Sequence, residues 1–343
     1  MNKNPLVSVI IPVFNAESFV YDAVTSILSQ THTNIEILII DDGSTDDSLK
    51  VLSGIKSPKI RLLSRENRGL VPTLNELLLA ASGDFIARMD ADDIADSYRI
   101  ERQLKFINEN DLDGCGSFVR QFGDVPRKIL LKPIESSSLF GHSFFDVPIW
   151  HPTVMIKSVV YKRFFYDADY THAEDTNMWV DMLLSNIKLG NIPLPLLNYR
   201  FHAGQVSSMH RSLQHKNSGR ARRKLFTLLP NDLLSDLEKD TLSFSHLTEI
   251  VSPQDLLLGY KKLLGYLKIN YSLPEKRVVE RKLLSIVFKS KNVSASEVLV
   301  VMSAGYSITL LFYLKVYTLK SILLFFPVLR YGKNSKSQFI DTN

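Results

Sequence analysis

Short apolar runs alternate with segments of helical spacing along the first hundred residues. Residues 7–13 form an almost uninterrupted β-branched run, which predicts a strand buried on both faces of a sheet. Further strands are expected at residues 35–40, 60–63 and 85–89, and helices at residues 19–30, from Ser44–Thr45 to about residue 55, and 71–81. This alternation predicts an α/β, Rossmann-like fold with a mostly parallel central sheet flanked by helices.

The pattern becomes less regular in the middle of the chain and changes again near residue 210. Helical spacing returns at 96–110, 159–164 and 176–187, a strand is expected at 196–201, and 111–150 has no clear period. After His210 the expected elements are helices with faces rich in Lys and Arg. We therefore expect an α/β unit at residues 1–210 and a basic, mainly helical region at 211–343, which forms a C-terminal appendage.

Polar clusters follow three of the predicted strands. They are Asn15 with Glu17, Asp41 with Asp42, and the Asp90-Ala91-Asp92-Asp93 segment. Ligands of parallel α/β sheets bind beyond the carboxyl ends of the strands, so these clusters predict one binding edge. Hard divalent ions such as Mg²⁺ or Mn²⁺ prefer oxygen ligands, and the acidic segment is a candidate site for one. The alternative is a solvated acidic turn that caps the following helix.

Composition and charge narrow the function classes. The 343 residues are 45% hydrophobic and 22% charged, which excludes a disordered chain, and one cysteine, Cys115, allows no internal disulfide. The net charge of +5 is uneven: residues 1–210 carry 20 basic against 26 acidic residues, and residues 211–343 carry 21 against 10. The front half therefore suits cation chemistry, and the back half suits an anionic surface.

Six motifs in order over residues 5–210 resemble those of family 2 glycosyltransferases, which have the GT-A fold. They are VSVIIPVFN at 7–15, SILSQT at 26–31, DDGSTD at 41–46, ENRG at 66–69, MDADD at 89–93 and AED at 173–175. The resemblance implies an enzyme that transfers a hexosyl or N-acetylhexosaminyl group from a nucleotide-diphosphate donor, most often a UDP-sugar, with inversion at the anomeric carbon. Processive members of the family carry a Gln-x-x-Arg-Trp motif that is absent here, which favours a single addition.

The resemblance also implies residues that bind the nucleotide. These are Pro12, Phe14, Glu17, Asp41, Asp42 and Asp90, with Phe14 packing on the base and Asp90 meeting the ribose or a metal-bound water. Carboxylates accept hydrogen bonds from base N–H groups and ribose hydroxyls. The alternatives are core packing for Phe14 and capping of a helix N-terminus for the acids.

The implied metal ligands are Asp92, the middle carboxylate of the acidic segment, and His202, with Mn²⁺ or Mg²⁺ as the cofactor. Asp175 matches the general base of the family, which takes the proton of the acceptor hydroxyl. Glu174, Trp179 and His151 are expected on the acceptor side. The Glu174–Asp175 pair has an alternative role as a helix cap, and Trp179 has one as a core residue.

The basic C-terminal region predicts a partner with negative charge. Arg220, Arg222, Arg223 and Lys224 form one cluster, and the apolar runs Val298–Leu314 and Ile322–Leu329 follow it. These runs have three interpretations: interfacial helices on a membrane, a marginal span, or core helices. We favour an anionic membrane surface over nucleic acid, and a cytoplasmic protein that is peripheral at the inner face of the cell membrane. A lipid-linked or surface-polysaccharide glycan is then the expected acceptor.

Two other functions remain open at this point. A nucleotidyltransferase that makes a nucleotide sugar also combines an α/β sheet with acidic metal ligands. Such enzymes usually carry a Gly-rich, basic loop after the first strand, whereas this chain has Phe-Asn-Ala-Glu-Ser there. The other alternative is a non-catalytic, membrane-bound protein that binds nucleotide sugars, against which the presence of both Asp92 and Asp175 argues.

Overall fold

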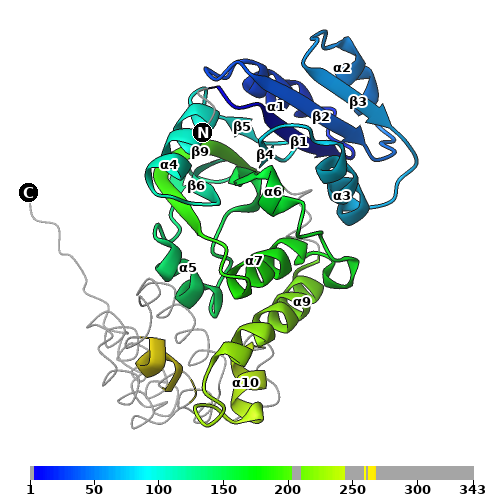
Figure 1. Cartoon of the computed structure of the whole chain (residues 1–343). Helices are drawn as coiled ribbons and strands as arrows, with labels where there is room; N and C mark the ends of the chain where they lie inside the picture. The colour runs from blue at the N-terminus through cyan, green and yellow to red at the C-terminus, as the bar shows by residue number, and fades with distance from the viewer. Residues whose placement is uncertain (1–3, 203–209, 244–258, 260–261, 268–343) are drawn as a thin grey trace, which may run out of the picture.

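The computed structural model describes residues 4–202, 210–243, 259 and 262–267. These residues form one nine-stranded sheet with the order β3-β2-β1-β4-β8-β6-β9-β5, and β7 pairs with β6 (Figure 1). The strands are β1 (Val7–Val13), β2 (Ile35–Asp41), β3 (Ile60–Ser64), β4 (Phe85–Arg88), β5 (Ile94–Ala95), β6 (Gly114–Gly123), β7 (Lys128–Leu130), β8 (Met155–Lys157) and β9 (Leu189–Phe201). The α-helices are α1 (Val20–Leu28), α2 (Ser48–Gly54), α3 (Leu70–Ala80), α4 (Arg99–Glu109), α5 (Ser136–Ser143), α6 (Ser158–Tyr161), α7 (Glu174–Leu184), α9 (Arg211–Arg223) and α10 (Asp236–Ser243). Three 3₁₀ helices are η1 (His151–Thr153), η2 (Ala168–Tyr170) and η3 (Lys224–Leu228).

The strands β1 to β4 form the parallel half of the sheet. Strand β1 pairs with β2 on one side and with β4 on the other, and β2 pairs with β3, all in parallel. Their four carboxyl ends therefore lie along one edge, as the sequence predicted. The α/β class and the mostly parallel central sheet are confirmed.

Both faces of β1 are buried, because its side chains alternate between two hydrophobic clusters. Val9 and Ile11 pack in the cluster that holds α1 and α4 residues such as Val24 and Ile100. Ile10 packs in the other cluster with Leu74 of α3 and side chains of α7. A strand buried on both faces needs an uninterrupted apolar run, which is the pattern that predicted it.

The less regular stretch 111–150 contains β6, β7 and α5, which the sequence pattern did not predict. Strand β6 begins Gly-Cys-Gly and ends Arg-Gln-Phe-Gly, so it lacks both alternation and a long apolar run. Its glycines are required by close approach. A Cβ at Gly114 would lie 2.6 Å from the Ile156 side chain, and one at Gly116 would lie 2.5 Å from the Asn191 side chain.

Strand β9 is longer than the predicted strand at 196–201, and it connects distant parts of the chain. It pairs in parallel with β6 along most of its length. Near its end it pairs antiparallel with β5, so that Ile94 faces Asn198 and Ala95 faces Leu197. Because β5 directly follows the acidic segment, this pairing brings residues 199–202 next to Asp92 and Asp93.

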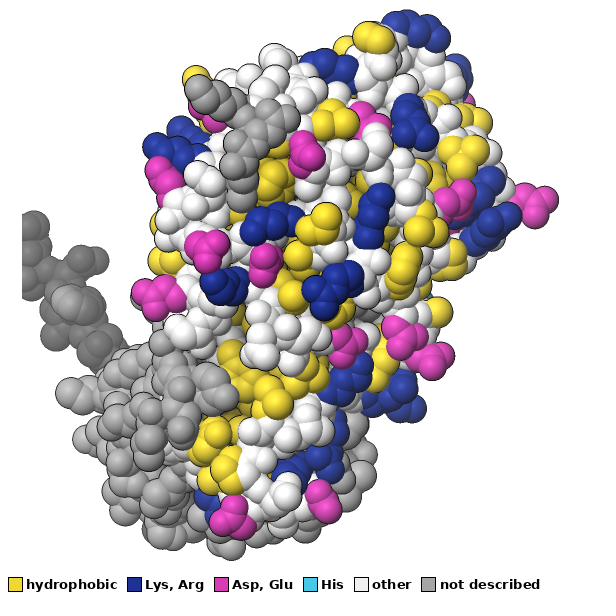
Figure 2. Space-filling model, in the orientation of Figure 1, with side chains coloured by type: hydrophobic (Ala, Val, Ile, Leu, Met, Phe, Trp, Pro, Cys, Tyr) yellow, Lys and Arg dark blue, Asp and Glu magenta, His cyan; other side chains and the backbone are white. Residues whose placement is uncertain are grey.

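The described part of the C-terminal region packs against α7. The Phe226 ring lies 5.1 Å from that of Phe144, and both belong to the hydrophobic cluster that contains α7. Lys224 Nζ lies 2.8 Å from an Asp181 carboxylate oxygen on α7, and Arg222 is buried. On the face in Figure 2, basic side chains in the region of α9 lie among acidic ones. Part of the basic cluster at 220–224 is therefore buried or paired with acidic side chains of the protein itself.

Within the described ranges, no helix is long and apolar enough to cross a membrane. The apolar runs at 298–314 and 322–329, and with them the choice between interfacial, spanning and core helices, lie outside the described residues.

Candidate active site

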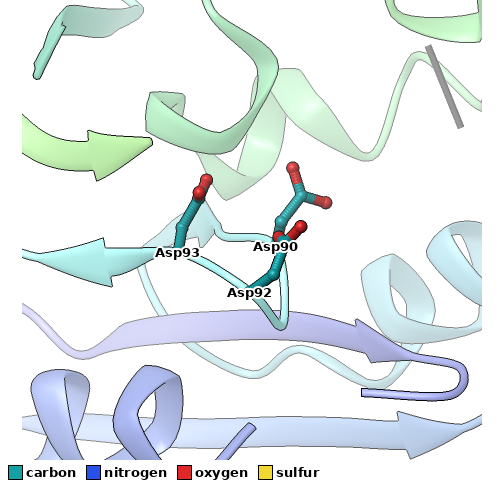
Figure 3. Close-up of side chains that lie close together, drawn as sticks. All are labelled: Asp90, Asp92 and Asp93. Carbon is teal, nitrogen blue, oxygen red and sulfur yellow. The ribbon is translucent and has the colours of Figure 1, made fainter. Parts of the chain in front are cut away.

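The acidic segment after β4 forms the centre of the site. Asp90, Asp92 and Asp93 each offer a carboxylate oxygen, and these oxygens lie within 4.8 Å of one another. All three carboxylates project to the same side of the loop (Figure 3). Three like charges at this spacing repel one another unless cationic groups or donors compensate them.

Arg88, the last residue of β4, compensates Asp90. Its two terminal nitrogens donate to the two oxygens of Asp90, one of them at 2.7 Å. Burial raises the pKa of Asp90, as do the Asp92 and Asp175 carboxylates, whereas the Arg88 guanidinium opposes this rise. A bidentate pair of this kind fixes the direction of the carboxylate as well as its charge. Arg88 therefore determines where Asp90 points.

Asp92 and Asp93 are held by the end of β9. Asp92 Oδ2 lies 3.0 Å from His202 Nε2, and both side chains are about a quarter exposed. The Arg200 backbone N–H donates to Asp93 Oδ1 at 2.9 Å, while no partner among the described residues reaches the buried Asp93 Oδ2. Burial, together with the neighbouring carboxylates Asp90 and Asp92, raises the pKa of Asp93 well above its ordinary value.

These residues fit a hard divalent cation. The donors are carboxylate oxygens with one imidazole, which Mn²⁺ and Mg²⁺ accept, and Asp93 offers an oxygen without a partner in the described structure. The raised pKa values of Asp90 and Asp93 arise partly from like charge, which a cation would relieve. Asp92 and His202, already in contact and reachable from solvent, are the residues that would hold it.

The first turn of α7 carries Asp175. Its Oδ1 accepts the Thr176 backbone N–H at 2.6 Å and the Thr176 hydroxyl at 3.2 Å. Burial raises the pKa of Asp175, and its bonds to Thr176 and the charges of Arg88 and Lys132 oppose that rise. The Asp175 charge contributes to the raised pKa of Asp90, and the Arg88 charge acts on both carboxylates, although 85 residues separate Asp90 and Asp175 along the chain. The structure therefore brings the predicted base and the acidic segment into one site.

Glu174, beside Asp175, is almost completely buried. Burial raises its pKa to about 7, and the Asp175 carboxylate adds to the rise. The backbone N–H groups of Glu174 and His172 oppose it by donating to the carboxylate. Glu174 thus takes up a proton near neutral pH, which distinguishes it from a surface carboxylate.

The replacement Glu174→Gln should make stability less dependent on pH. A raised native pKa of an acid contributes stability below the unfolded pKa of 4.5, and this stability is lost as pH rises through about 7. Between about pH 5 and about pH 8 the wild type should therefore lose roughly 2–3 kcal/mol that Glu174→Gln keeps. Urea unfolding at both pH values measures this difference. Equal pH dependence of the two proteins would contradict it.

His151 and Trp179, expected on the acceptor side, lie next to each other. Trp179 is fully buried and its ring meets the His151 ring edge-on at 5.9 Å, so it supports His151 from within the core. His151 Nε2 lies 2.7 Å from Tyr166 Oη, which in turn lies 2.6 Å from Tyr161 Oη. Burial and the Arg88 charge lower the pKa of His151 well below its ordinary value. His151 is therefore neutral near physiological pH.

Among the residues predicted to bind the nucleotide, the Phe14 side chain is exposed, whereas several others are buried or hydrogen-bonded within the protein. Phe14, at the end of β1, is 52% exposed, whereas Pro12 is buried within β1. Glu17 Oε2 accepts the Asp47 backbone N–H at 2.8 Å. Asp41 accepts the Ser64 hydroxyl at 2.8 Å. Phe14 is thus the aromatic face that is open to a base at this edge.

Asp42 holds the entry of α3. Its two oxygens accept the backbone N–H groups of Arg68 and Gly69 at 2.9 and 2.8 Å, and the Arg65 guanidinium pairs with it. Arg68 and Gly69 directly precede α3, so Asp42 fixes the loop that leads into this helix and does not cap its first turn. A nucleotide that contacts Asp42 would have to use carboxylate oxygens that already accept these two backbone N–H groups.

Two positively charged side chains of the site, Arg88 and Lys132, were not predicted from the sequence. Arg88 had a local signal, because an arginine inside an apolar strand and two residues before a carboxylate needs a partner. Lys132 had none. It is buried, its Nζ lies 4.5 Å from the Trp150 ring centre and 3.4 Å from Asp146, and its charge acts on Asp175.

Comparisons with known proteins find relatives of this chain by sequence. The sequence profile of the family described as "Glycosyl transferase family 2" matches residues 8–146. A Haemophilus influenzae protein described as an uncharacterized glycosyltransferase is 32% identical over 254 residues, which make up 69% of this chain and 78% of that protein. An Escherichia coli protein named UDP-Glc:alpha-D-GlcNAc-diphosphoundecaprenol beta-1,3-glucosyltransferase WfaP is 32% identical over 205 residues, or 59% of this chain and 80% of that protein.

The fold also has counterparts among solved structures. The crystal structure of S. aureus TarS 1-349 in complex with UDP-GlcNAc matches with a TM-score of 0.54 at 19% identity, and the match covers 81% of this chain and 84% of that one. At this identity the likeness extends to the fold, which is the GT-A arrangement that the motifs implied.

Proposed function

Because this chain belongs to glycosyl transferase family 2, and is therefore an enzyme that transfers a sugar from a nucleotide donor, we propose that it does so by metal-assisted inversion in a single addition. One observation carries the proposal: Arg88 pairs with Asp90 and its charge also acts on Asp175, so that the predicted base and the acidic segment lie within electrostatic range of each other. Inversion needs a base on the face of the sugar opposite the leaving diphosphate, and in this proposal Asp175 takes that position.

Asp92 and His202 would hold the divalent cation in this proposal. When bound, the cation would supply positive charge that stabilises the leaving nucleoside diphosphate. Arg88 keeps Asp90 turned toward the donor, where it accepts from the ribose or from water. The nucleotide base packs on the exposed ring of Phe14. Glu17, Asp41 and Asp42 belong to the loops that surround the nucleoside.

Asp175 takes the proton of the acceptor hydroxyl as its oxygen attacks the anomeric carbon. Its other neighbours fit this role: Thr176 fixes its Oδ1, and the charges of Arg88 and Lys132 favour the ionised form that accepts a proton. His151 and Glu174 lie on the acceptor side of the same site, with Trp179 behind His151.

A lipid-linked glycan is the acceptor that we favour, and the inner face of the cell membrane is the location. The name of the Escherichia coli relative, a transferase to a diphosphoundecaprenol-linked sugar, supports this acceptor. The excess of basic residues in 211–343 supports an anionic surface as partner. UDP is the nucleotide that the same name supports.

The test is incubation of the full chain with Mn²⁺ and a panel of UDP-, GDP- and TDP-sugars, followed by measurement of the nucleotide released. We expect release of a nucleoside diphosphate from one donor class, stimulated by a lipid-linked acceptor and lost with a chelator. Pyrophosphate release from a nucleoside triphosphate and a sugar phosphate would overturn the proposal in favour of nucleotidyl transfer. Binding of nucleotide sugar without any release would favour a non-catalytic binding protein.

A further inference from the structure

The end of β9 presents Arg200 and His202 on one face, toward the acidic segment. Tyr199 and Phe201, which alternate with them along the chain, pack on other rings: the Tyr199 ring lies 5.9 Å from the Trp150 ring, and the Phe201 ring meets Tyr199 edge-on at 5.2 Å. This alternation is that of an extended strand, and it continues to His202, one residue beyond β9. A contact that fixes the side of the strand on which Arg200 lies therefore also fixes the side on which His202 lies.

Arg200 is held between two aromatic rings. Its guanidinium carbon lies 4.6 Å from the centre of the Phe19 ring and 4.4 Å from that of Phe122. Guanidinium groups stack favourably on aromatic faces at such distances. From this position Arg200 Nε donates to the Asp92 backbone oxygen at 2.8 Å, and its backbone N–H holds Asp93.

Phe19 touches the second residue of the same face as well. Its ring centre lies 5.1 Å from that of His202, whose Nε2 is bonded to Asp92. Phe19 directly precedes α1 and follows the loop that carries Phe14 and Glu17. One partly buried ring thus lies between the proposed nucleotide loop and both residues of β9 that hold the acidic segment.

We propose that Phe19 is a positioning residue, which together with Phe122 clamps Arg200 and His202 so that Asp92 and His202 are arranged for the cation before it binds. The inference rests on the proposed function, since it concerns the metal ligands of that site. Without the ring, Arg200 loses one of its two stacking faces and His202 loses its neighbour. Binding the cation would then have to order the end of β9, and the affinity would fall by that cost.

Phe19→Leu in the full chain tests this clamp. Mn²⁺ binding, measured by the EPR signal of free Mn²⁺ in the presence of UDP, should be about three- to tenfold weaker than in the wild type, the range expected for one lost cation–π contact. Phe122→Leu should act in the same direction, and Phe19→Trp, which keeps an aromatic face, should restore the affinity. The matched control is Tyr21→Leu, which removes a 58% exposed ring two residues further on, in the first turn of α1, and should leave Mn²⁺ binding unchanged.

Circular dichroism melting separates positioning from general destabilisation, because the control variant and Phe19→Leu can be compared at equal folded fractions. Equal Mn²⁺ affinity of folded Phe19→Leu and wild type would overturn the clamp alone and leave the proposed function standing. The same holds if Tyr21→Leu weakens binding as much, or if Phe19→Trp restores nothing. A wild type that binds no Mn²⁺ would overturn the clamp together with the metal-assisted part of the proposed function.

Discussion

Replacing Asp175 by asparagine should lower the turnover of sugar transfer by about 10²- to 10⁴-fold, the range that a positioned general base contributes. The amide has the same size as the carboxylate and its oxygen still accepts the bonds from Thr176, so the start of α7 should keep its geometry. What the amide lacks is the ability to take a proton. The loss should therefore appear in kcat, while binding of the donor changes little.

Release of nucleoside diphosphate under saturating donor measures this effect, and calorimetric titration with the donor measures binding. Asp47→Asn is the matched control, because among the described residues the Asp47 side chain forms its ion pair with Lys50 at the surface, where such a pair contributes little. If the turnover of Asp175→Asn differs from that of the control by only a few fold, Asp175 is not the general base. That result would leave the assignment of sugar transfer intact.

Replacing Asp92 by asparagine should reduce turnover by about 100-fold or more, since the charge stabilisation supplied at this position is worth several kcal/mol. Asparagine keeps the size of the side chain and can still bond to His202, but it removes the anionic ligand. The affinity for Mn²⁺ should fall with the activity, and excess Mn²⁺ should recover only part of it.

Two readouts separate this prediction from a loss of folding. The melting temperature of Asp92→Asn should stay close to that of the Asp47→Asn control, because Asp92 is partly exposed and removing one of three like charges relieves repulsion. Full activity of Asp92→Asn at ordinary Mn²⁺ concentrations would contradict the assignment of Asp92 as the metal ligand.

The parallel half of the fold was predictable because its signals are local. The β-branched run of β1 and the carboxylates after β4 lie within single segments, and the parallel pairing of β1 with β2 and β4 follows from the alternation of elements. Strand β6 was not predictable from period, since Gly114 and Gly116 are set by contacts with Ile156 and Asn191, which are distant in sequence.

The predicted site residues come together, but their partners could not be read from the sequence. Asp175 comes within electrostatic range of Asp90 because α7 shares a hydrophobic cluster with Ile86 of β4, and His202 reaches Asp92 because β5 pairs with β9. No local pattern encodes either contact. Asp42 illustrates the same limit, because its bonds to the entry of α3 become visible only in three dimensions. Lys224 in the basic cluster likewise has an internal partner, Asp181, which a charge pattern cannot reveal.

The anomeric configuration of the product tests the central claim most directly, because the proposed mechanism puts attack under Asp175 and departure of the diphosphate on opposite faces of the sugar. Water can serve as the acceptor if the donor is hydrolysed slowly, and ¹H NMR identifies the first sugar formed before mutarotation. From an α-linked donor such as UDP-glucose or UDP-GlcNAc, we predict the β anomer. The α anomer as the first product would contradict the account.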